Sequence, residues 1–174
     1  WFYILWKEKN AWLSYGESDE KEMEKLTKDY RAFLDAGKTE RECVTELVRE
    51  AEANGYVSLE AKQAAGEKIQ PGDKVYAVGM KKIMALFHVG QEPLEKGMNI
   101  LGAHIDSPRL DVKQNPLYED TDLAYLDTHY YGGVKKYQWV ALPLAIHGVI
   151  AKKNGSVVNV TIGEDENDPI VYIT

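Results

Sequence analysis

The sequence is poor in cysteine, with Cys43 as the only one among 174 residues. A single thiol cannot form a disulfide within the chain and fits a reducing compartment, so we expect the protein in the cytoplasm. Cys43 lies in a helical pattern, which predicts a buried, inert thiol rather than a nucleophile. The spacings Cys-x-x-Cys and His-x-x-x-His are also missing, which argues against a structural zinc cage.

Positive charge and long apolar runs are scarce as well. The formal net charge is −7, and this acidic balance argues against a nucleic-acid partner, which would need a basic face. The apolar run at the start, WFYILW, has six residues and is too short to span a membrane or to act as a signal core. It could form a buried strand, dock on a neighbour or be the end of a trimmed chain. The length suffices for one domain with a core.

Two helices and several strands are predicted from periodicity and turn signals. A helix is expected over Ser18–Leu34, where apolar residues recur at steps of three and four. A second helix begins at Thr39, whose capping box with Glu42 precedes an apolar stripe, and it ends at Asn54-Gly55. The expected strands are Lys74–Val78, Ile83–Val89, Ala124–Tyr131, Ile146–Ala151, Val157–Ile162 and Ile170–Ile173, with breaks at Gln114–Pro116 and a hairpin turn at Asn154-Gly155.

The candidate chemistry lies in LGAHIDSPRLD, residues 101–111. The apolar residues before it predict a strand that Ser107-Pro108 ends. Residues two apart on a strand share a face, so His104 and Asp106 would project side by side. A metal-bound imidazole whose other nitrogen is held by a carboxylate has this arrangement. A hydrogen-bonded surface pair explains the same spacing equally simply.

The other histidines and turns are better explained by structure. His88 lies in an expected strand without a partner motif, and His147 lies in an apolar run, which predicts a satisfied core histidine. Gly132-Gly133 could let the backbone approach a ligand or form a plain turn. The acidic segment Gly163–Pro169 does not match an EF-hand loop, so a solvated turn is expected.

Three longer sequence motifs include or follow the His-x-Asp pattern: GAHIDSPRLDVKQNPLYED, THYYGGVKKYQW and GEDENDP. In this order they closely resemble the aspartyl-aminopeptidase family of di-zinc metallopeptidases, and its bacterial branch in particular. With weaker similarity before them, they cover most of the chain from about residue 40 onward. After the Tyr-Gly-Gly, the best-known eukaryotic members have a segment rich in Trp, Asp and Arg. This chain has KKYQWVALPLAIHG instead, so substrate preference does not carry over without a test.

The resemblance implies an α/β fold with two parts. Residues 1–138 would be the N-terminal part of a mixed-sheet α/β/α metallopeptidase catalytic domain. Residues 139–174 would be the start of an inserted β-rich dimerisation domain. The resemblance also implies a homo-oligomer in which dimers assemble into a larger particle, and a peptide substrate rather than a nucleic acid or a membrane.

The resemblance further implies a zinc-dependent aminopeptidase that removes N-terminal aspartate or glutamate with two zinc ions per complete site. His104 would be the first metal ligand in chain order, and Asp106 the catalytic residue that orients it. The remaining ligands and the glutamate base follow Thr174 in family members, so we expect this chain alone to be inactive. Arg109, Lys113, Lys135 or Lys136 could pair with an acidic substrate, or could be solvated or structural charges.

Two alternatives remain open on the sequence. The chain could be a non-catalytic fragment or self-association module that kept the fold without a complete metal site, in which case it should lack stoichiometric zinc. A metallopeptidase of a sister family would share His-x-Asp, but it would not be expected to share SPRLDVKQNP or THYYGG.

Overall fold

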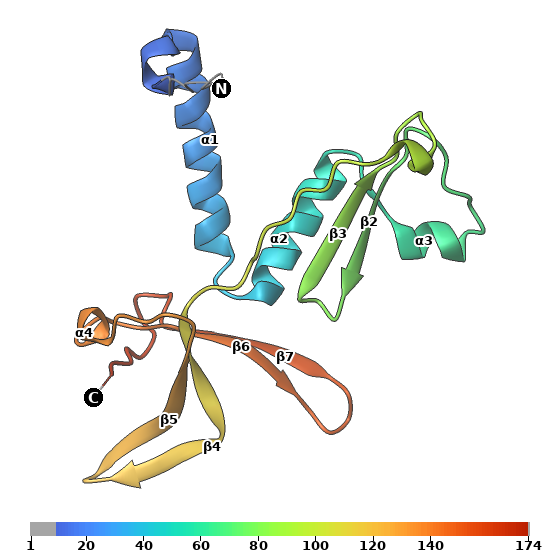
Figure 1. The fold of residues 1–174 in the computed structure, drawn as a ribbon. Coiled ribbons are helices and arrows are strands. Elements are labelled where there is room, and N and C mark those ends of the chain that lie inside the picture. The colour runs from blue at the N-terminus through green and yellow to red at the C-terminus, as the bar shows by residue number, and fades with distance from the viewer. Residues whose placement is uncertain (1–9, 174) are drawn as a thin grey trace, which may run out of the picture.

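The computed structural model describes residues 10–173, so WFYILW and Thr174 lie outside the described residues. Figure 1 shows the arrangement of its helices and strands. The helices are η1 (Ala11–Ser14), α1 (Glu17–Ala36), α2 (Glu40–Ala53), α3 (Leu59–Ala64), η2 (Leu94–Lys96) and α4 (Lys136–Trp139). The strands are β1 (Val57–Ser58), β2 (Lys74–Gly79), β3 (Ile83–His88), β4 (Arg109–Asp120), β5 (Leu123–Tyr131), β6 (Ile146–Ala151) and β7 (Val157–Ile162).

Helix α2 forms where the sequence predicts it, because its first turn satisfies its own backbone donors. The Thr39 hydroxyl accepts from the Glu42 N–H at 3.4 Å, and a Glu42 carboxylate oxygen accepts from the Thr39 N–H at 2.9 Å. This reciprocal pair is the expected capping box. The helix ends at Asn54, and Gly55 follows with φ 81°, a left-handed conformation that glycine adopts readily.

A small core lies between α2 and a mixed three-stranded sheet. Strand β1 runs parallel to β2, and β2 is antiparallel to β3, which confirms the expected hairpin. Three residues, 80–82, connect the paired Gly79 and Ile83, and Met80 and Lys81 have positive φ. The buried apolar residues of the described chain are Cys43, Val44, Ala51, Val75 and Tyr76.

Two further hairpins extend from a common junction near the start of α2 (Figure 1). The β6–β7 hairpin has the predicted bounds, and Gly155 at its turn has φ 85°. The predicted break at Gln114–Pro116 is wrong, because β4 continues through it. Proline's missing N–H is accommodated by a register shift between Val112 and Leu117 in the pairing with β5. The predicted strand Ile170–Ile173 is also wrong, since only Val171 pairs, in a single bridge with Leu144.

Helix α1 confirms the predicted helix but stands apart from the core (Figure 1). None of its residues is buried, and Leu26 on its apolar stripe is 70% exposed. The chain exposes 15428 Å², whereas a compact monomer of 19.7 kDa exposes roughly 8,600 Å². Extensive apolar surface is therefore available for contacts with other polypeptide. Among the helices described, none combines the length and apolarity needed to cross a membrane.

Candidate metal site

The segment that carries the candidate residues is not a strand. Residues 97–108 have no regular secondary structure and lead directly into β4 at Arg109. The prediction of a buried strand around His104 is therefore wrong. Within residues 10–173 no neighbouring strand pairs with this segment, and its apolar Ile100 and Leu101 are 80% and 98% exposed. The backbone cannot form a ladder without such a partner.

This segment is held instead by α2. The Cys43 thiol lies 3.6 Å from the Ile105 carbonyl and donates to the Gly37 carbonyl at 3.4 Å. Burial raises the pKa of Cys43, and the charges of Glu42 and Glu40 raise it further. The thiol is therefore protonated and buried, in agreement with the inert cysteine expected from the sequence.

His104 and Asp106 are brought together by this irregular backbone. Nδ1 of His104 lies 2.9 Å from the Asp106 carbonyl oxygen and 3.4 Å from its carboxylate Oδ1. Because both neighbours accept hydrogen bonds, they favour the tautomer with the proton on Nδ1. The side chain is 84% exposed, and Nε2 then presents its lone pair outward. This donor arrangement fits one ligand of a zinc ion.

Tyr131, at the end of β5, contacts the Asp106 carboxylate oxygen that does not face His104. Its hydroxyl donates to Oδ2 of Asp106 at 2.7 Å. This hydrogen bond lowers the pKa of Asp106, and a backbone hydrogen bond adds to the effect. Conversely, the bond to Asp106 raises the pKa of Tyr131. Asp106 is thus an ionised carboxylate with one oxygen toward His104 and the other toward a tyrosine.

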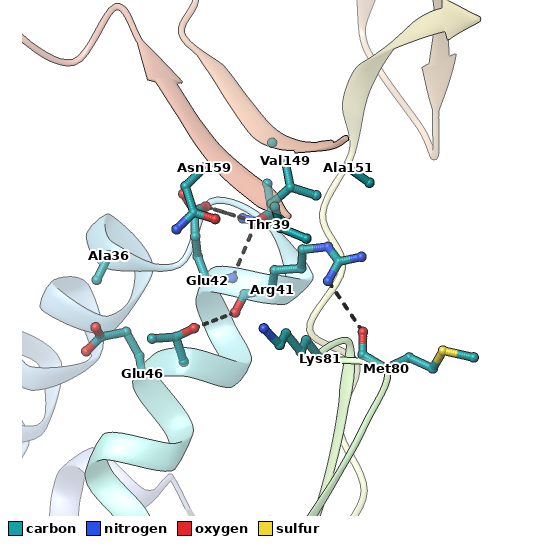
Figure 2. Close-up of a pocket in the computed structure, with 13 residues that line it drawn as sticks. Ala36, Thr39, Arg41, Glu42, Glu46, Met80, Lys81, Val149, Ala151 and Asn159 are labelled. Carbon is teal, nitrogen blue, oxygen red and sulfur yellow. Dashed lines mark hydrogen bonds between the residues drawn. The ribbon is translucent and has the colours of Figure 1, made fainter. Parts of the chain in front are cut away.

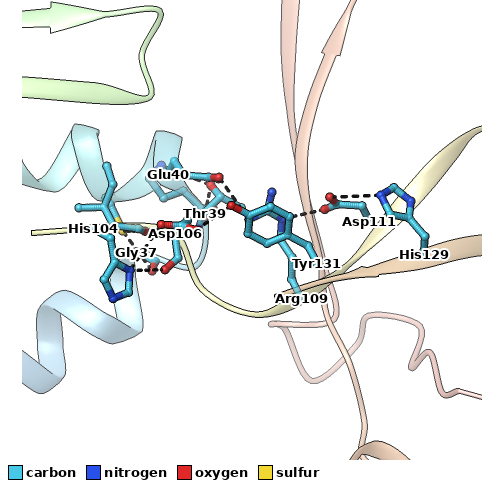
Figure 3. A network of polar contacts seen from close by, with 12 residues as sticks. Gly37, Thr39, Glu40, His104, Asp106, Arg109, Asp111, His129 and Tyr131 are labelled. Carbon is cyan, nitrogen blue, oxygen red and sulfur yellow. Dashed lines mark hydrogen bonds and ion pairs between the residues drawn. The ribbon is translucent and has the colours of Figure 1, made fainter. Parts of the chain in front are cut away.

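Arg109 links this group to α2 and to the base of the β4–β5 hairpin (Figure 3). Its guanidinium lies over the Tyr131 ring, 4.2 Å from the centroid. Nη1 is 3.2 Å from Glu40 on α2, and Nε donates to Asp111 at 2.7 Å. His129 lies at the outer end, 3.9 Å from Asp111.

The four cations proposed for an acidic substrate are mostly engaged within the chain. Arg109 holds two carboxylates, Lys113 pairs with Asp127 at 2.9 Å, and the ammonium of Lys136 lies 4.4 Å from the centroid of the Tyr130 ring. These three therefore have structural partners.

One histidine does not make a zinc site by itself. Within residues 10–173, no three His, Cys, Asp or Glu side chains are arranged to hold a metal ion. Catalytic zinc usually takes three protein ligands and keeps one open position. His104 fits one of these ligands, so the others would have to come from outside the described residues.

His147 is a satisfied histidine, as predicted, but its partners are two glutamates from distant segments. Nδ1 is 2.8 Å from Glu42 and Nε2 is 2.9 Å from Glu164, and the side chain is 12% exposed. Glu42 therefore takes part in the capping box of α2 and also connects strand β6 to that helix.

A cleft of about 590 Å³ lies between the start of α2, the β2–β3 turn and the β6–β7 hairpin (Figure 2). Its lining includes neither His104 nor Asp106.

The contact of His147 with its two glutamates predicts a pH dependence. Burial alone lowers the pKa of His147, but the hydrogen bonds and charges of Glu42 and Glu164 outweigh it and raise the pKa above 6.5. Burial raises the pKa of Glu42, yet the hydrogen bonds from His147 and Thr39 bring it below 4.5. The stability that His147 contributes to the folded state is therefore fully present below pH 6.5 and is lost as pH rises through the folded-state pKa of His147. The stability that Glu42 contributes is fully present above pH 4.5 and is lost as pH falls through the lower folded-state pKa of Glu42.

NMR titration of the His147 ring measures the pKa of this histidine directly. We expect a pKa above 6.5, and a lower pKa in Glu164→Gln, because one of the two stabilising carboxylates is then gone. Asp165→Asn, one residue away and without contact to His147, serves as the control. An unshifted His147 pKa in the Glu164→Gln protein would contradict the contact.

Solved structures of aminopeptidases share this fold. Aminopeptidase I from Borrelia burgdorferi B31 superposes with a TM-score of 0.86 at 38% identity, over 95% of this chain and 40% of that one. The M18-family aminopeptidase of Thermotoga maritima gives 0.82 at 42% identity, over 95% of this chain and 35% of that one. The α/β class expected from the sequence is thereby confirmed, and the fold is that of the N-terminal part of a metallopeptidase.

The sequence comparisons identify the family. The model of the aminopeptidase I zinc metalloprotease (M18) family matches residues 33–174. A relative in Clostridium acetobutylicum, named a probable M18 family aminopeptidase 1, is 59% identical over 171 residues, which are 98% of this chain and 37% of that protein. The chain belongs to the M18 family of zinc metalloproteases, as its motifs predicted. It spans little more than a third of the length of the relatives it matches.

Proposed function

We propose that the protein is a zinc-dependent aminopeptidase and that His104 is one of its metal ligands. The observation that carries the proposal is the imidazole of His104, held at Nδ1 by Asp106 with Nε2 directed outward, in a chain of the M18 family. When bound, zinc supplies a Lewis acid and lowers the pKa of water to about 7. His104 holds the ion, and Asp106 fixes the tautomer and raises the basicity of Nε2.

We extend the proposal to two zinc ions per complete site and to N-terminal aspartate or glutamate as the residue removed. Both follow from the resemblance of SPRLDVKQNP and THYYGG to the aspartyl-aminopeptidase family. Of the four candidate cations, Lys135 is exposed and has neither a carboxylate nor an aromatic ring as partner among residues 10–173, whereas Lys136 lies over the Tyr130 ring. Lys135 is therefore our candidate for pairing with an acidic side chain of a substrate.

We also propose that residues 1–138 belong to the catalytic domain and residues 139–174 to a dimerisation domain. The β6–β7 hairpin supports this division, because it forms its own two-stranded sheet. Its exposed Ile150 and Val157 are suited to contacts between subunits of a homo-oligomer. A cytoplasmic location and assembly from dimers stay predictions.

The test uses the protein encoded by the complete gene and a panel of peptides that differ in their first residue. We expect release of the N-terminal residue, fastest for aspartate or glutamate. Activity should be lost on chelation and restored by zinc. N-acetylated peptides are the matched control and should resist cleavage. Protein that lacks stoichiometric zinc and hydrolyses none of the peptides would favour the non-catalytic module instead.

A further inference from the structure

Tyr131 is placed to control the candidate metal ligand without touching the metal itself. It is the last residue of β5 and pairs with Arg109, the first residue of β4. Its hydroxyl donates to one oxygen of Asp106, whose other oxygen lies 3.4 Å from Nδ1 of His104. Since Asp106 lies in an irregular segment, its carboxylate needs a fixed donor to keep one orientation. Tyr131 supplies that donor.

The ring of the tyrosine also has a partner. The Arg109 guanidinium covers one face of its ring at 4.2 Å, and Glu40 at the start of α2 holds that guanidinium. After Tyr131 the backbone turns sharply at Gly132, with φ 75°. A Cβ on Gly132 would lie 3.4 Å from the Cα of Pro108. The positive φ explains the first glycine of the Gly-Gly pair, and the contact with Pro108 shows that the end of β5 lies against the segment that carries Asp106.

We propose that Tyr131 is a positioning residue that sets the orientation of Asp106 and, through it, the zinc affinity of His104. The inference rests on the proposed function, because it presumes that His104 ligates zinc. The path runs from Glu40 through Arg109 to the Tyr131 ring, and from its hydroxyl through Asp106 to the imidazole (Figure 3). Side chains behind a metal ligand typically change metal affinity or activity by about 10–100-fold when they are altered.

The experiment compares Tyr131→Phe with Tyr130→Phe in the protein encoded by the complete gene. Tyr130→Phe is the matched control, because Tyr130 lies on the same strand but its hydroxyl makes no hydrogen bond to Asp106 or His104 within residues 10–173. Zinc affinity is measured by competition with a chromophoric chelator, and the cobalt-substituted proteins are compared by visible spectroscopy. For Tyr131→Phe we expect about tenfold weaker zinc binding or more, and shifted cobalt bands. Tyr130→Phe should match the wild type in both.

A second variant, Arg109→Lys, tests the contact that holds the Tyr131 ring in this path. It keeps a positive charge near Glu40 but removes the planar group over the Tyr131 ring. Zinc binding should weaken in the same direction, and circular dichroism establishes that each variant is folded. Wild-type protein that binds no zinc would overturn both the proposed function and the role of Tyr131. Wild-type binding of zinc with unchanged affinity and cobalt bands in Tyr131→Phe would overturn the role of Tyr131 alone.

Discussion

His104→Ala is expected to abolish aminopeptidase activity and to lower the zinc bound per subunit in the protein encoded by the complete gene. The imidazole of His104 is held at Nδ1 by Asp106, while Nε2 faces outward and is available to a metal ion. Alanine supplies no donor atom. A catalytic zinc with three protein ligands would keep only two of them and would bind far more weakly.

The matched control for this substitution is His88→Ala. His88 is an exposed histidine at the end of β3, where it pairs with Lys74 and takes no part in the contacts around Asp106. We expect the zinc content and the activity of His88→Ala to equal those of the wild type. Full activity with unchanged zinc in His104→Ala would refute the assignment of His104.

Asp106→Asn is expected to weaken activity or zinc affinity by about 10–100-fold, the range found for side chains that orient a metal ligand. The substitution keeps the shape of the side chain but removes its charge. The Asp106 backbone carbonyl, 2.9 Å from Nδ1, remains as an acceptor. The imidazole therefore keeps its tautomer but loses the electrostatic support of the carboxylate, so the effect is smaller than that of removing His104.

Two comparisons isolate the contribution of Asp106. Asp127→Asn, which removes a carboxylate paired with Lys113 on the same hairpin, should leave zinc affinity unchanged. Adding Tyr131→Phe to Asp106→Asn should cost less than it does in the wild type, because the two residues act along one path. Fully additive losses in zinc affinity would show that Tyr131 and Asp106 act independently.

Local signals in the sequence were sufficient for the two longest helices, α1 and α2, and for the β2–β3 and β6–β7 hairpins. Thr39 and Glu42 define a capping box within four residues, and Asn154-Gly155 defines a turn within two, so each interaction is complete in a short segment. The two-residue β1 and the six-residue α3 were missed, because neither is long enough to show a period. The apolar residues around Ile100 predict burial, but a strand also needs a partner edge, which the described residues do not provide.

The residues of the candidate site could be predicted from the sequence, but their contacts with distant segments could not. His104 and Asp106 lie two positions apart, so their proximity follows from the sequence even though the segment is not a strand. Tyr131 lies 25 residues from Asp106, and Glu42 lies 105 residues from His147. Contacts at such distances depend on how the hairpins return to α2. The word THYYGG marked the region of Tyr131 but gave no indication of its partner.

The most direct test of the account is the position of zinc relative to His104. Crystals of the zinc-loaded protein encoded by the complete gene, measured at the zinc absorption edge, would locate the ion by its anomalous signal. We predict a zinc about 2.0–2.1 Å from Nε2 of His104, with Nδ1 still facing Asp106 and both Asp106 carboxylate oxygens off the metal. Zinc bound elsewhere without His104, zinc on Nδ1, or an Asp106 oxygen directly on the ion would contradict the account.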